Sequence, residues 1–180
     1  FSYFLKYKIK SILTGDIATK IIFNIARKKN EGIYLLGGTD IVLKNAKQNL
    51  EKNYNDIKIC GVNNGYFAEN ETAEIIKNIN QSNSSFLLVG LGSPKQEEWC
   101  YYNKDKLNVK FIICIGGLLN IFSGNTRRAP IIIQKLALEW LWRLISEPKR
   151  LWKRYLINDF IFFPLISKQI FSRKRNNIIN

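Results

Sequence analysis

The sequence predicts an α/β fold with a Rossmann-like parallel sheet flanked by helices, followed by a C-terminal helical appendage that is basic and aromatic. Three observations predict it. Short apolar runs of strand length alternate with segments of helical periodicity as far as Gly117. Several of these runs end in glycines, which mark turns. No strand pattern remains after Gly117, so helices alone are expected there.

The first element is expected to be a helix over about residues 16–29. Ile17, Ile21 and Ile25 recur near helical spacing, and Asp16 can cap its start. The other elements of the α/β part are expected in this order: strand 33–36, helix 40–52, strand 57–62, helix 69–80, strand 86–89, a helix from Pro94 and strand 109–115. Alternation of this kind implies parallel strands joined by right-handed crossovers.

The remainder of the chain is expected to be helical. Its segments are a short helix 118–122, a basic loop 123–130, a helix 131–145, a helix from Pro148 to about residue 157, and an apolar, aromatic tail 160–171. We therefore divide the chain into an α/β core, residues 1–124, and a helical, membrane-associating appendage, residues 125–180.

The segment 86–99, FLLVGLGSPKQEEW, predicts an anion-binding turn. Gly90 and Gly92 let the backbone turn sharply and let a ligand approach it. Ser93 can cap the following helix, and Pro94 suits its first position. The result would be a helix start with free N–H donors, where phosphate is stabilised, although an ordinary βα turn explains a single junction equally well.

Two further junctions favour ligand binding over an ordinary turn. Gly37 and Gly38 follow the strand 33–36, with Thr39 as a cap, and Gly116 and Gly117 follow the strand 109–115. Open α/β sheets bind ligands outside the carboxyl ends of their strands. Neither junction contains G-x-G-x-x-G or G-x-x-x-x-G-K-[ST], so neither a dinucleotide site nor a P-loop is indicated.

The charge balance predicts an acidic partner. The chain has 28 Lys and Arg residues against 14 Asp and Glu, a formal net charge of +14. A nucleotide, a nucleic acid or an anionic membrane surface is expected to bind such a chain. Histidine, the commonest general base and metal ligand, is absent, and so is an Asp-x-Asp motif, so no metal or other cofactor is expected.

The cysteines predict packing and not chemistry. Cys60, Cys100 and Cys114 lie far apart in the sequence, without C-x-x-C spacing. Cys114 lies within an apolar strand and Cys60 ends one. We therefore expect small core residues in a reducing compartment, in preference to a metal or redox site.

The chain from Arg127 onward is expected to contact a membrane surface. It holds 12 of the 28 basic residues, three of the 14 acidic ones and three of the four tryptophans. In the helix from Pro148, basic side chains can share one side and Leu151, Trp152 and Tyr155 another, as in interfacial helices. A helix docked on its own core with a solvated basic face explains the pattern equally well. The tail is shorter than the ~20 apolar residues of a membrane span.

Several motifs then occur in a fixed order between about residues 11 and 165. They are LTGD (13–16), LLGG (35–38), GYF (65–67), VGLGSPKQE (89–97), IGGLLNIFSG (115–124), RRAP (127–130), LEWLWR (138–143), EPKR (147–150) and RY (154–155). In sequence and order they resemble the WecG/TagA/CpsF glycosyltransferases.

The resemblance implies an inverting, metal-independent hexosyltransferase. Such an enzyme transfers a sugar, typically N-acetylmannosamine or its uronic acid, from a UDP-sugar to a polyprenyl-diphosphate-linked acceptor. The products are linkage units of teichoic acids, common antigen or capsule. The protein would be peripheral, at the cytoplasmic face of the plasma membrane. No nucleic-acid partner is expected, and the oligomeric state is left open, a homo-oligomer included.

The resemblance and the glycine junctions together imply a substrate site at the carboxyl ends of the strands. Lys95 is expected to contact phosphate, with a solvated lysine as the alternative, and Gln96 the sugar or uracil, with packing as the alternative. Asp16 is expected either to contact substrate or to cap its helix. The other expected substrate-binding residues are Thr14, Gly37, Gly38, Gly65, Tyr66, Gly90, Gly92, Gly116, Gly117, Arg127, Arg128, Arg143, Arg150 and Arg154. The arginines are expected to divide between lipid headgroups and diphosphates, whose oxygens a guanidinium binds in pairs.

Two departures from the family limit what is carried over. Family members have a further segment before the LTGD motif, with an Asn-Ala-Asp-Gly stretch whose aspartate is the proposed catalytic base. Nothing in this chain matches that stretch, and the chain begins with Phe1 and lacks methionine. We therefore expect a fragment with little or no transferase activity and assign no catalytic residue. Asn120 stands where the family usually has Asp, and a neutral amide cannot act as a base.

Two other functions are kept as alternatives. One is an inactive or non-catalytic basic α/β domain that binds nucleotide or nucleic acid. Its aromatic residues, however, lie among aliphatic ones instead of forming stacking platforms. The other is a nicotinamide-dependent oxidoreductase, which the absence of G-x-G-x-x-G disfavours.

Overall fold

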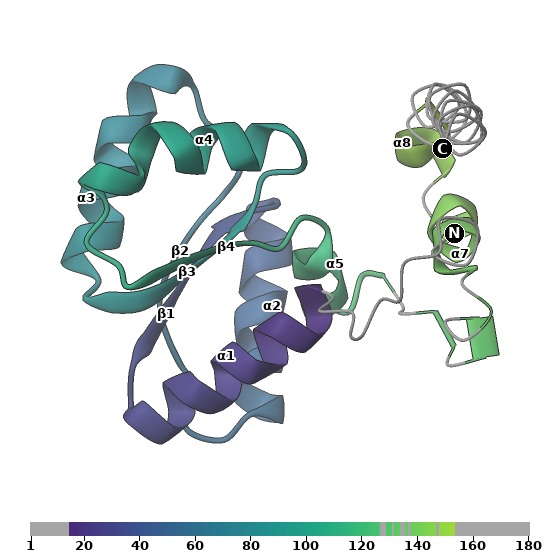
Figure 1. Cartoon of the computed structure of the whole chain (residues 1–180), viewed down its shortest axis with the longest axis horizontal. Coiled ribbons are helices and arrows are strands. Elements are labelled where there is room, and N and C mark those ends of the chain that lie inside the picture. The colour runs from purple at the N-terminus through teal and green to yellow at the C-terminus, as the bar shows by residue number, and fades with distance from the viewer. Residues whose placement is uncertain are drawn as a thin grey trace, which may run out of the picture. The chain divides into compact units, whose positions relative to one another are not determined.

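A four-stranded parallel sheet forms the centre of the α/β unit in this computed structural model, which describes residues 15–126, 129–130, 132–133, 136, 138–146 and 148–153 (Figure 1). The strands are β1 (Gly32–Gly37), β2 (Lys58–Asn63), β3 (Ser84–Gly90) and β4 (Phe111–Cys114). They lie in the order β2-β1-β3-β4, and every neighbouring pair is parallel. The predicted α/β fold is confirmed.

Helices cover both faces of this sheet (Figure 1). Side chains of α1 (Gly15–Lys29), α2 (Asp40–Asn53) and α5 (Leu118–Phe122) share one hydrophobic core with the strands. Side chains of α3 (Thr72–Gln81) and α4 (Lys95–Asn103) form a second core on the other face. A short 3-10 turn, η1 (Glu69–Glu71), precedes α3, and another, η2 (Lys104–Lys106), follows α4.

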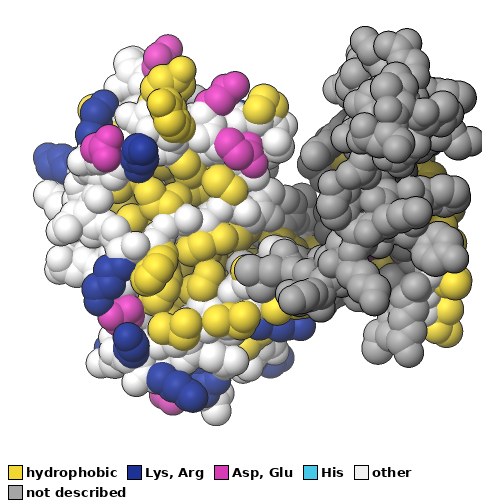
Figure 2. Space-filling view, viewed as in Figure 1, with side chains coloured by type: hydrophobic (Ala, Val, Ile, Leu, Met, Phe, Trp, Pro, Cys, Tyr) yellow, Lys and Arg dark blue, Asp and Glu magenta, His cyan; other side chains and the backbone are white. Residues whose placement is uncertain are grey.

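The position of each strand in the sheet explains its sequence. All six residues of β1 are buried, because helices cover both faces of this central strand. Along β1, Leu35 packs into the first core and Leu36 into the second. β4 lies at an edge, where Phe111 is 58% exposed although its ring stacks on that of Phe86. Figure 2 shows hydrophobic side chains exposed across one face of the α/β unit.

Thr39 caps α2, as its sequence predicts. Its Oγ1 accepts a hydrogen bond of 3.3 Å from the backbone N–H of Val42. Two other predicted caps are wrong. Since α1 begins at Gly15, Asp16 lies inside its first turn, where the helix dipole favours a carboxylate. Since α4 begins at Lys95, the cap residue is Pro94, after a cis Ser93–Pro94 peptide, and not Ser93.

The second compact unit of the chain comprises Phe1–Ile12 and Arg128–Asn180, and the first comprises Leu13–Arg127. The described helices of the second unit are α7 (Glu139–Ser146) and α8 (Pro148–Lys153). The expectation of a single helix over residues 131–145 is wrong, because Leu138 lies outside helical structure. The Leu138 carbonyl instead accepts hydrogen bonds from Leu141 and Trp142 at the start of α7. The expected tail 160–171 lies outside the described residues.

No helix among the described residues combines the length and the apolar character needed to cross a bilayer. The division into a catalytic core and a membrane-associating appendage stays a prediction.

Candidate functional site

The loops that follow β1, β2 and β3 pack against one another at the carboxyl edge of the sheet. Gly65, after β2, donates a backbone hydrogen bond of 2.8 Å to the carbonyl oxygen of Gly38, after β1. A Cβ atom on Gly65 would lie 3.0 Å from the Cα of Gly37. Gly37 itself has a φ of +133°, and a Cβ atom there would overlap the carbonyl group of Gly90. The backbones approach so closely that these positions require glycine.

The loop after β4 is held to the start of α4 by Gln96. Its Oε1 accepts a hydrogen bond of 3.0 Å from the backbone N–H of Gly116. Its Nε2 donates one of 2.7 Å to the Glu97 carboxylate, and the side chain is 6% exposed. A Cβ atom on Gly90 would lie 2.9 Å from the carbonyl oxygen of Gly116, so this loop also joins the glycine cluster. The structure gives Gln96 a packing role, and its contact with substrate stays a prediction.

Open space lies beside Gly92, in the loop between β3 and α4. Its φ is +82°, and no atom lies within 4 Å of the position that a Cβ atom would occupy. The expectation of free N–H donors at this helix start is wrong for two of them. The N–H groups of Gln96 and Glu97 donate to the carbonyl oxygens of Gly92 and Pro94, at 2.8 and 3.0 Å. The open backbone at Gly92, and not the helix end alone, is therefore what a ligand could approach.

Lys95, the first residue of α4, follows this loop in the sequence. Its side chain is exposed, and its Nζ lies 5.1 Å from the centre of the Phe67 ring, a distance typical of a cation–π contact. This contact connects the start of α4 to the loop after β2. Tyr66, beside Phe67, is 80% exposed. Two aromatic rings and one ammonium group thus lie at the carboxyl edge of the sheet.

Phe67 also lines a polar cavity of about 240 Å³ after β2. The cavity is lined by Asn63, Asn64, Tyr66, Phe67, Glu71, Glu74, Ile75 and Asn78. Asn64 is fixed at both ends of its amide, because Nδ2 donates to Asp40 Oδ1 at 3.2 Å and Oδ1 accepts from the N–H of Tyr66 at 3.1 Å. Amides and carboxylates of this kind recognise hydroxyl groups and the edge of a base.

A second, larger groove of about 790 Å³ lies between α3 and α4. It is lined by Glu69, Asn70, Thr72, Ala73, Ile76, Trp99, Tyr102, Asn103 and Lys106. None of these residues is among the expected site residues. Within the described part of the chain, the indole N–H of Trp99 is buried without a hydrogen-bond acceptor.

The sequence profile of the Glycosyl transferase WecG/TagA/CpsF family matches residues 1–176. This chain belongs to that family. It is 34% identical over 149 residues to an N-acetylglucosaminyldiphosphoundecaprenol N-acetyl-beta-D-mannosaminyltransferase of Bacillus subtilis (strain 168), covering 83% of this chain and 57% of that protein. It is 32% identical over 159 residues to the enzyme of the same name from Staphylococcus aureus (strain MRSA252), covering 88% of this chain and 60% of the relative. The chain therefore spans less than two thirds of the length of these relatives.

The WecG/TagA/CpsF motif residues divide into three groups. The loop glycines, Lys95 and Gln96 lie together at the carboxyl edge, as described above. Tyr66 lies there too, and Gly117 precedes α5 as its cap residue. Thr14, Arg127, Arg128 and Arg154 lie outside the described residues. Arg143 and Arg150 lie in α7 and α8, but the structure does not describe their side chains.

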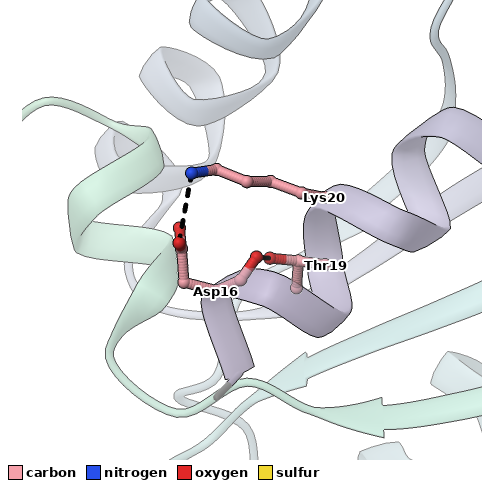
Figure 3. A network of polar contacts seen from close by, with 3 residues as sticks. All are labelled: Asp16, Thr19 and Lys20. Carbon is pink, nitrogen blue, oxygen red and sulfur yellow. Dashed lines mark hydrogen bonds and ion pairs between the residues drawn. The ribbon is translucent and has the colours of Figure 1, made fainter. Parts of the chain in front are cut away.

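Asp16 takes part in a local network at the start of α1 (Figure 3). Its Oδ2 lies 3.2 Å from Lys20 Nζ, and its backbone oxygen accepts a hydrogen bond of 3.0 Å from the hydroxyl group of Thr19. Figure 3 shows the Asp16 and Lys20 side chains pointing toward one another from successive turns. A Cβ atom on Gly15 would lie 3.3 Å from Leu118 Cδ1, so α1 begins beside α5. Asp16 is engaged in an ion pair, and its contact with substrate stays a prediction.

The sequence does not predict two features of this region. Phe67 was expected only as part of the GYF motif, yet its ring contacts Lys95 and lines the cavity. Asp40 was expected only as a helix residue, yet its carboxylate holds Asn64. The position of Phe67, two residues after a loop glycine, is a weak signal for its role. No local signal predicts the contact of Asp40 with Asn64.

The cysteines are not the buried core residues that the sequence predicts. Cys60 and Cys114 are exposed and Cys100 is half-buried. Cys60 lies in the edge strand β2 and Cys114 at the end of the edge strand β4, where one side of each strand faces solvent. The described residues contain no cluster of three or more His, Cys, Asp or Glu side chains that could hold a metal ion.

Proposed function

We propose that this chain carries the donor site of a UDP-sugar-dependent glycosyltransferase at the carboxyl edge of its sheet. The enzyme would transfer an N-acetylmannosamine-type sugar to a polyprenyl-diphosphate-linked acceptor, in teichoic acid, capsule or other surface polysaccharide synthesis. Family membership supports sugar transfer, and the names of the relatives supply the sugar and the lipid-linked acceptor. The observation that carries the proposal is the open backbone at Gly92, in the loop that leads to the exposed Lys95 at the start of α4.

The donor diphosphate is proposed to lie beside Gly92 and Lys95. Backbone without a side chain allows close approach, and the ammonium group offers a charge-assisted hydrogen bond to a phosphate oxygen. Carboxylates lie in the first turn of both helices, Asp40 in α2 and Glu97 and Glu98 in α4, so net charge does not separate the two positions. The first turn of α4 also holds the Lys95 ammonium, and open space lies beside Gly92, so we place the diphosphate at the β3–α4 loop.

The uridine is proposed to lie at the polar cavity after β2. Phe67 lines this cavity and contacts Lys95, so the cavity and the diphosphate position are neighbours. The amides of Asn63 and Asn64 can bond the uracil edge or the ribose hydroxyl groups. The exposed ring of Tyr66 offers a surface on which the base can stack.

The chemical step would be an inverting displacement at the anomeric carbon. An acceptor hydroxyl group attacks that carbon and gives its proton to a general base, the bond to the diphosphate oxygen breaks, and UDP departs with the bonding electron pair. Negative charge grows on the leaving diphosphate, and Lys95 is proposed to stabilise it. We propose that no divalent cation is needed, because this ammonium group supplies positive charge at the same place. We assign no residue of the chain as the catalytic base.

The appendage, residues 125–180, is proposed to bind the cytoplasmic membrane surface that holds the acceptor. Apolar side chains of its described part are exposed, with Ile132 at 72% and Ile145 at 69%. Ile145→Asp should reduce sedimentation of the protein with anionic vesicles. Ile41→Asp is the matched control, because Ile41 is 70% exposed but lies in the α/β unit. Equal vesicle binding by the two variants would argue against the appendage as the membrane surface.

Calorimetric titration tests the donor site. UDP and UDP-N-acetylmannosamine should bind, NAD should not, and EDTA should leave the affinity unchanged. Lys95→Ala should weaken UDP binding about tenfold, which is what one charge-assisted hydrogen bond contributes. Lys104→Ala is the control, because Lys104 also contacts an aromatic ring, that of Tyr101, at the opposite end of α4. Equal affinity in the two variants, or no binding of UDP, would contradict the proposed site.

The nucleic-acid alternative is tested in parallel. An electrophoretic shift with DNA or RNA that falls steeply with salt, in a protein that does not bind anionic vesicles, would favour that alternative.

A further inference from the structure

Cys100 and Cys114 bring two thiol groups together on neighbouring elements. Cys100 lies in the middle of α4, and Cys114 is the last residue of β4. Their Sγ atoms are 3.7 Å apart. Cys60, the third cysteine, lies in β2 at the opposite edge of the sheet, with β1 and β3 between. The chain therefore holds one close thiol pair and one separate thiol.

Two neighbouring contacts join α4 to the end of β4 and the loop that follows it, and the thiol pair is one of them. The other is the hydrogen bond between Gln96 and Gly116. Gln96 and Cys100 are four residues apart on α4 and so lie on one face of the helix. Cys114 and Gly116 are two residues apart on the opposing chain. The thiols thus face one another next to a contact that positions a loop of the candidate site.

We propose that Cys100 and Cys114 are a modification site, at which a low-molecular-weight disulfide such as oxidised glutathione oxidises the pair to an intramolecular disulfide. The Sγ atoms must approach from 3.7 Å to a bond of about 2.05 Å, which calls for a local adjustment of both residues. The inference does not rest on the proposed transferase function.

The reaction proceeds by two thiol–disulfide exchanges. Cys114, the more exposed thiol, attacks oxidised glutathione as its thiolate and releases one glutathione thiolate, which takes up a proton. The Cys100 thiolate then attacks the Cys114 sulfur and releases the second glutathione. The two protein thiols lose two hydrogens in all, and one oxidised glutathione becomes two reduced molecules.

The surroundings of the pair make this oxidation slow at neutral pH. Burial raises the pKa of the Cys100 thiol to about 12, with the neighbouring Cys114 and the Glu97 carboxylate adding to the shift. Burial also raises the pKa of Cys114, again with a contribution from Glu97. Only the thiolate reacts, so both exchanges should be faster at alkaline pH than at neutral pH.

The product disulfide would fasten α4 to the end of β4. Oxidised protein should therefore unfold at a higher temperature than reduced protein, because the cross-link restricts the unfolded chain. Dithiothreitol should reverse the shift. The same treatment of Cys100→Ser should leave the unfolding temperature unchanged.

Intact-mass analysis tests the inference in a Cys60→Ser background, where only the two thiols remain. After incubation with oxidised glutathione, the protein should lose the mass of two hydrogens, carry no glutathione and resist alkylation by N-ethylmaleimide. With Cys100→Ser added, Cys114 should instead retain one glutathione, because no resolving thiol is present. A doubly glutathionylated protein would overturn the inference. So would two free thiols under conditions in which Cys60 of the unaltered chain is glutathionylated.

Discussion

The side-chain oxygen Oε1 of Gln96 accepts a hydrogen bond of 3.0 Å from the backbone N–H of Gly116. This bond joins the first turn of α4 to the loop after β4, and it is made by an amide that is almost fully buried. Gly90 packs against the same loop. One glutamine therefore helps to hold the loop after β4 against the start of α4, next to the β3–α4 loop that is proposed to hold the donor.

Replacing Gln96 should destabilise the protein. Gln96→Ala leaves the half-buried N–H of Gly116 and the Glu97 carboxylate without their present partner, which costs about 1–3 kcal/mol for the unsatisfied N–H group. Urea denaturation measures the loss in the free energy of unfolding. Glu98→Ala is the control, because Glu98 is exposed in the same turn. Equal stability of the two variants would show that the bond is dispensable.

Gly37 and Gly92 should respond differently to alanine. Gly37→Ala places a methyl group on the carbonyl group of Gly90, so the backbone must move, at a cost of more than about 3 kcal/mol or with failure to fold. Gly92→Ala meets only the strain of a positive φ, about 1–2 kcal/mol, because nothing lies near its Cβ position.

The same glycine pair separates folding from binding. A soluble, folded Gly92→Ala variant should bind UDP more weakly, because the new methyl group occupies the open space at which the diphosphate is proposed to lie. Thermal melts and UDP titration of both variants provide the comparison. A Gly37→Ala protein as stable as Gly92→Ala would contradict the close packing of these loops.

Thr39 should contribute through its cap alone. Thr39→Ala removes the acceptor for the N–H of Val42 and should cost about 1 kcal/mol in the free energy of unfolding. Thr39→Ser keeps the hydroxyl group and should retain most of that stability. If chemical denaturation shows equal losses for both variants, the methyl group and not the cap carries the effect.

The ion pair between Glu31 and Lys110 should make stability depend on pH. The pair joins the chain before β1 to the chain before β4. The hydrogen bond that Lys110 donates to the Glu31 carboxylate lowers the pKa of Glu31 below the usual value of 4.5. A lowered carboxyl pKa stabilises the folded state above the usual value, and this contribution is lost as the pH falls through the lower value. The Glu31→Gln variant should melt slightly below the unaltered protein at pH 7, and the difference should shrink below pH 4. A constant difference across this range would contradict the assignment.

The α/β alternation could be predicted because each strand is a short, nearly continuous apolar run. In the central strands β1 and β3 such runs are buried on both faces, so Leu35 and Leu88 carry a clear signal. Thr39 could be predicted as a cap because a hydroxyl residue follows two glycines and precedes a helical pattern. These features depend on neighbours in the sequence.

Features that depend on distant residues could not be predicted. The order of the strands puts Cys60 and Cys114 at opposite edges of the sheet, which explains why both are exposed despite their apolar neighbours. The contact of Cys114 with Cys100, like that of Gln96 with Gly116, joins two elements whose packing no local pattern specifies. Ser93 is the better cap by local sequence, but α4 begins at Lys95, so Pro94 is the cap residue.

Hydrogen exchange with and without UDP tests the location of the donor site most directly. If the account is right, UDP should slow exchange in the loops after β2 and β3, with the largest effect between Gly90 and Lys95, and Lys95→Ala should reduce that protection at a UDP concentration near the dissociation constant of the unaltered protein. Protection confined to the groove between α3 and α4, or exchange that UDP does not change anywhere at the carboxyl edge of the sheet, would contradict it.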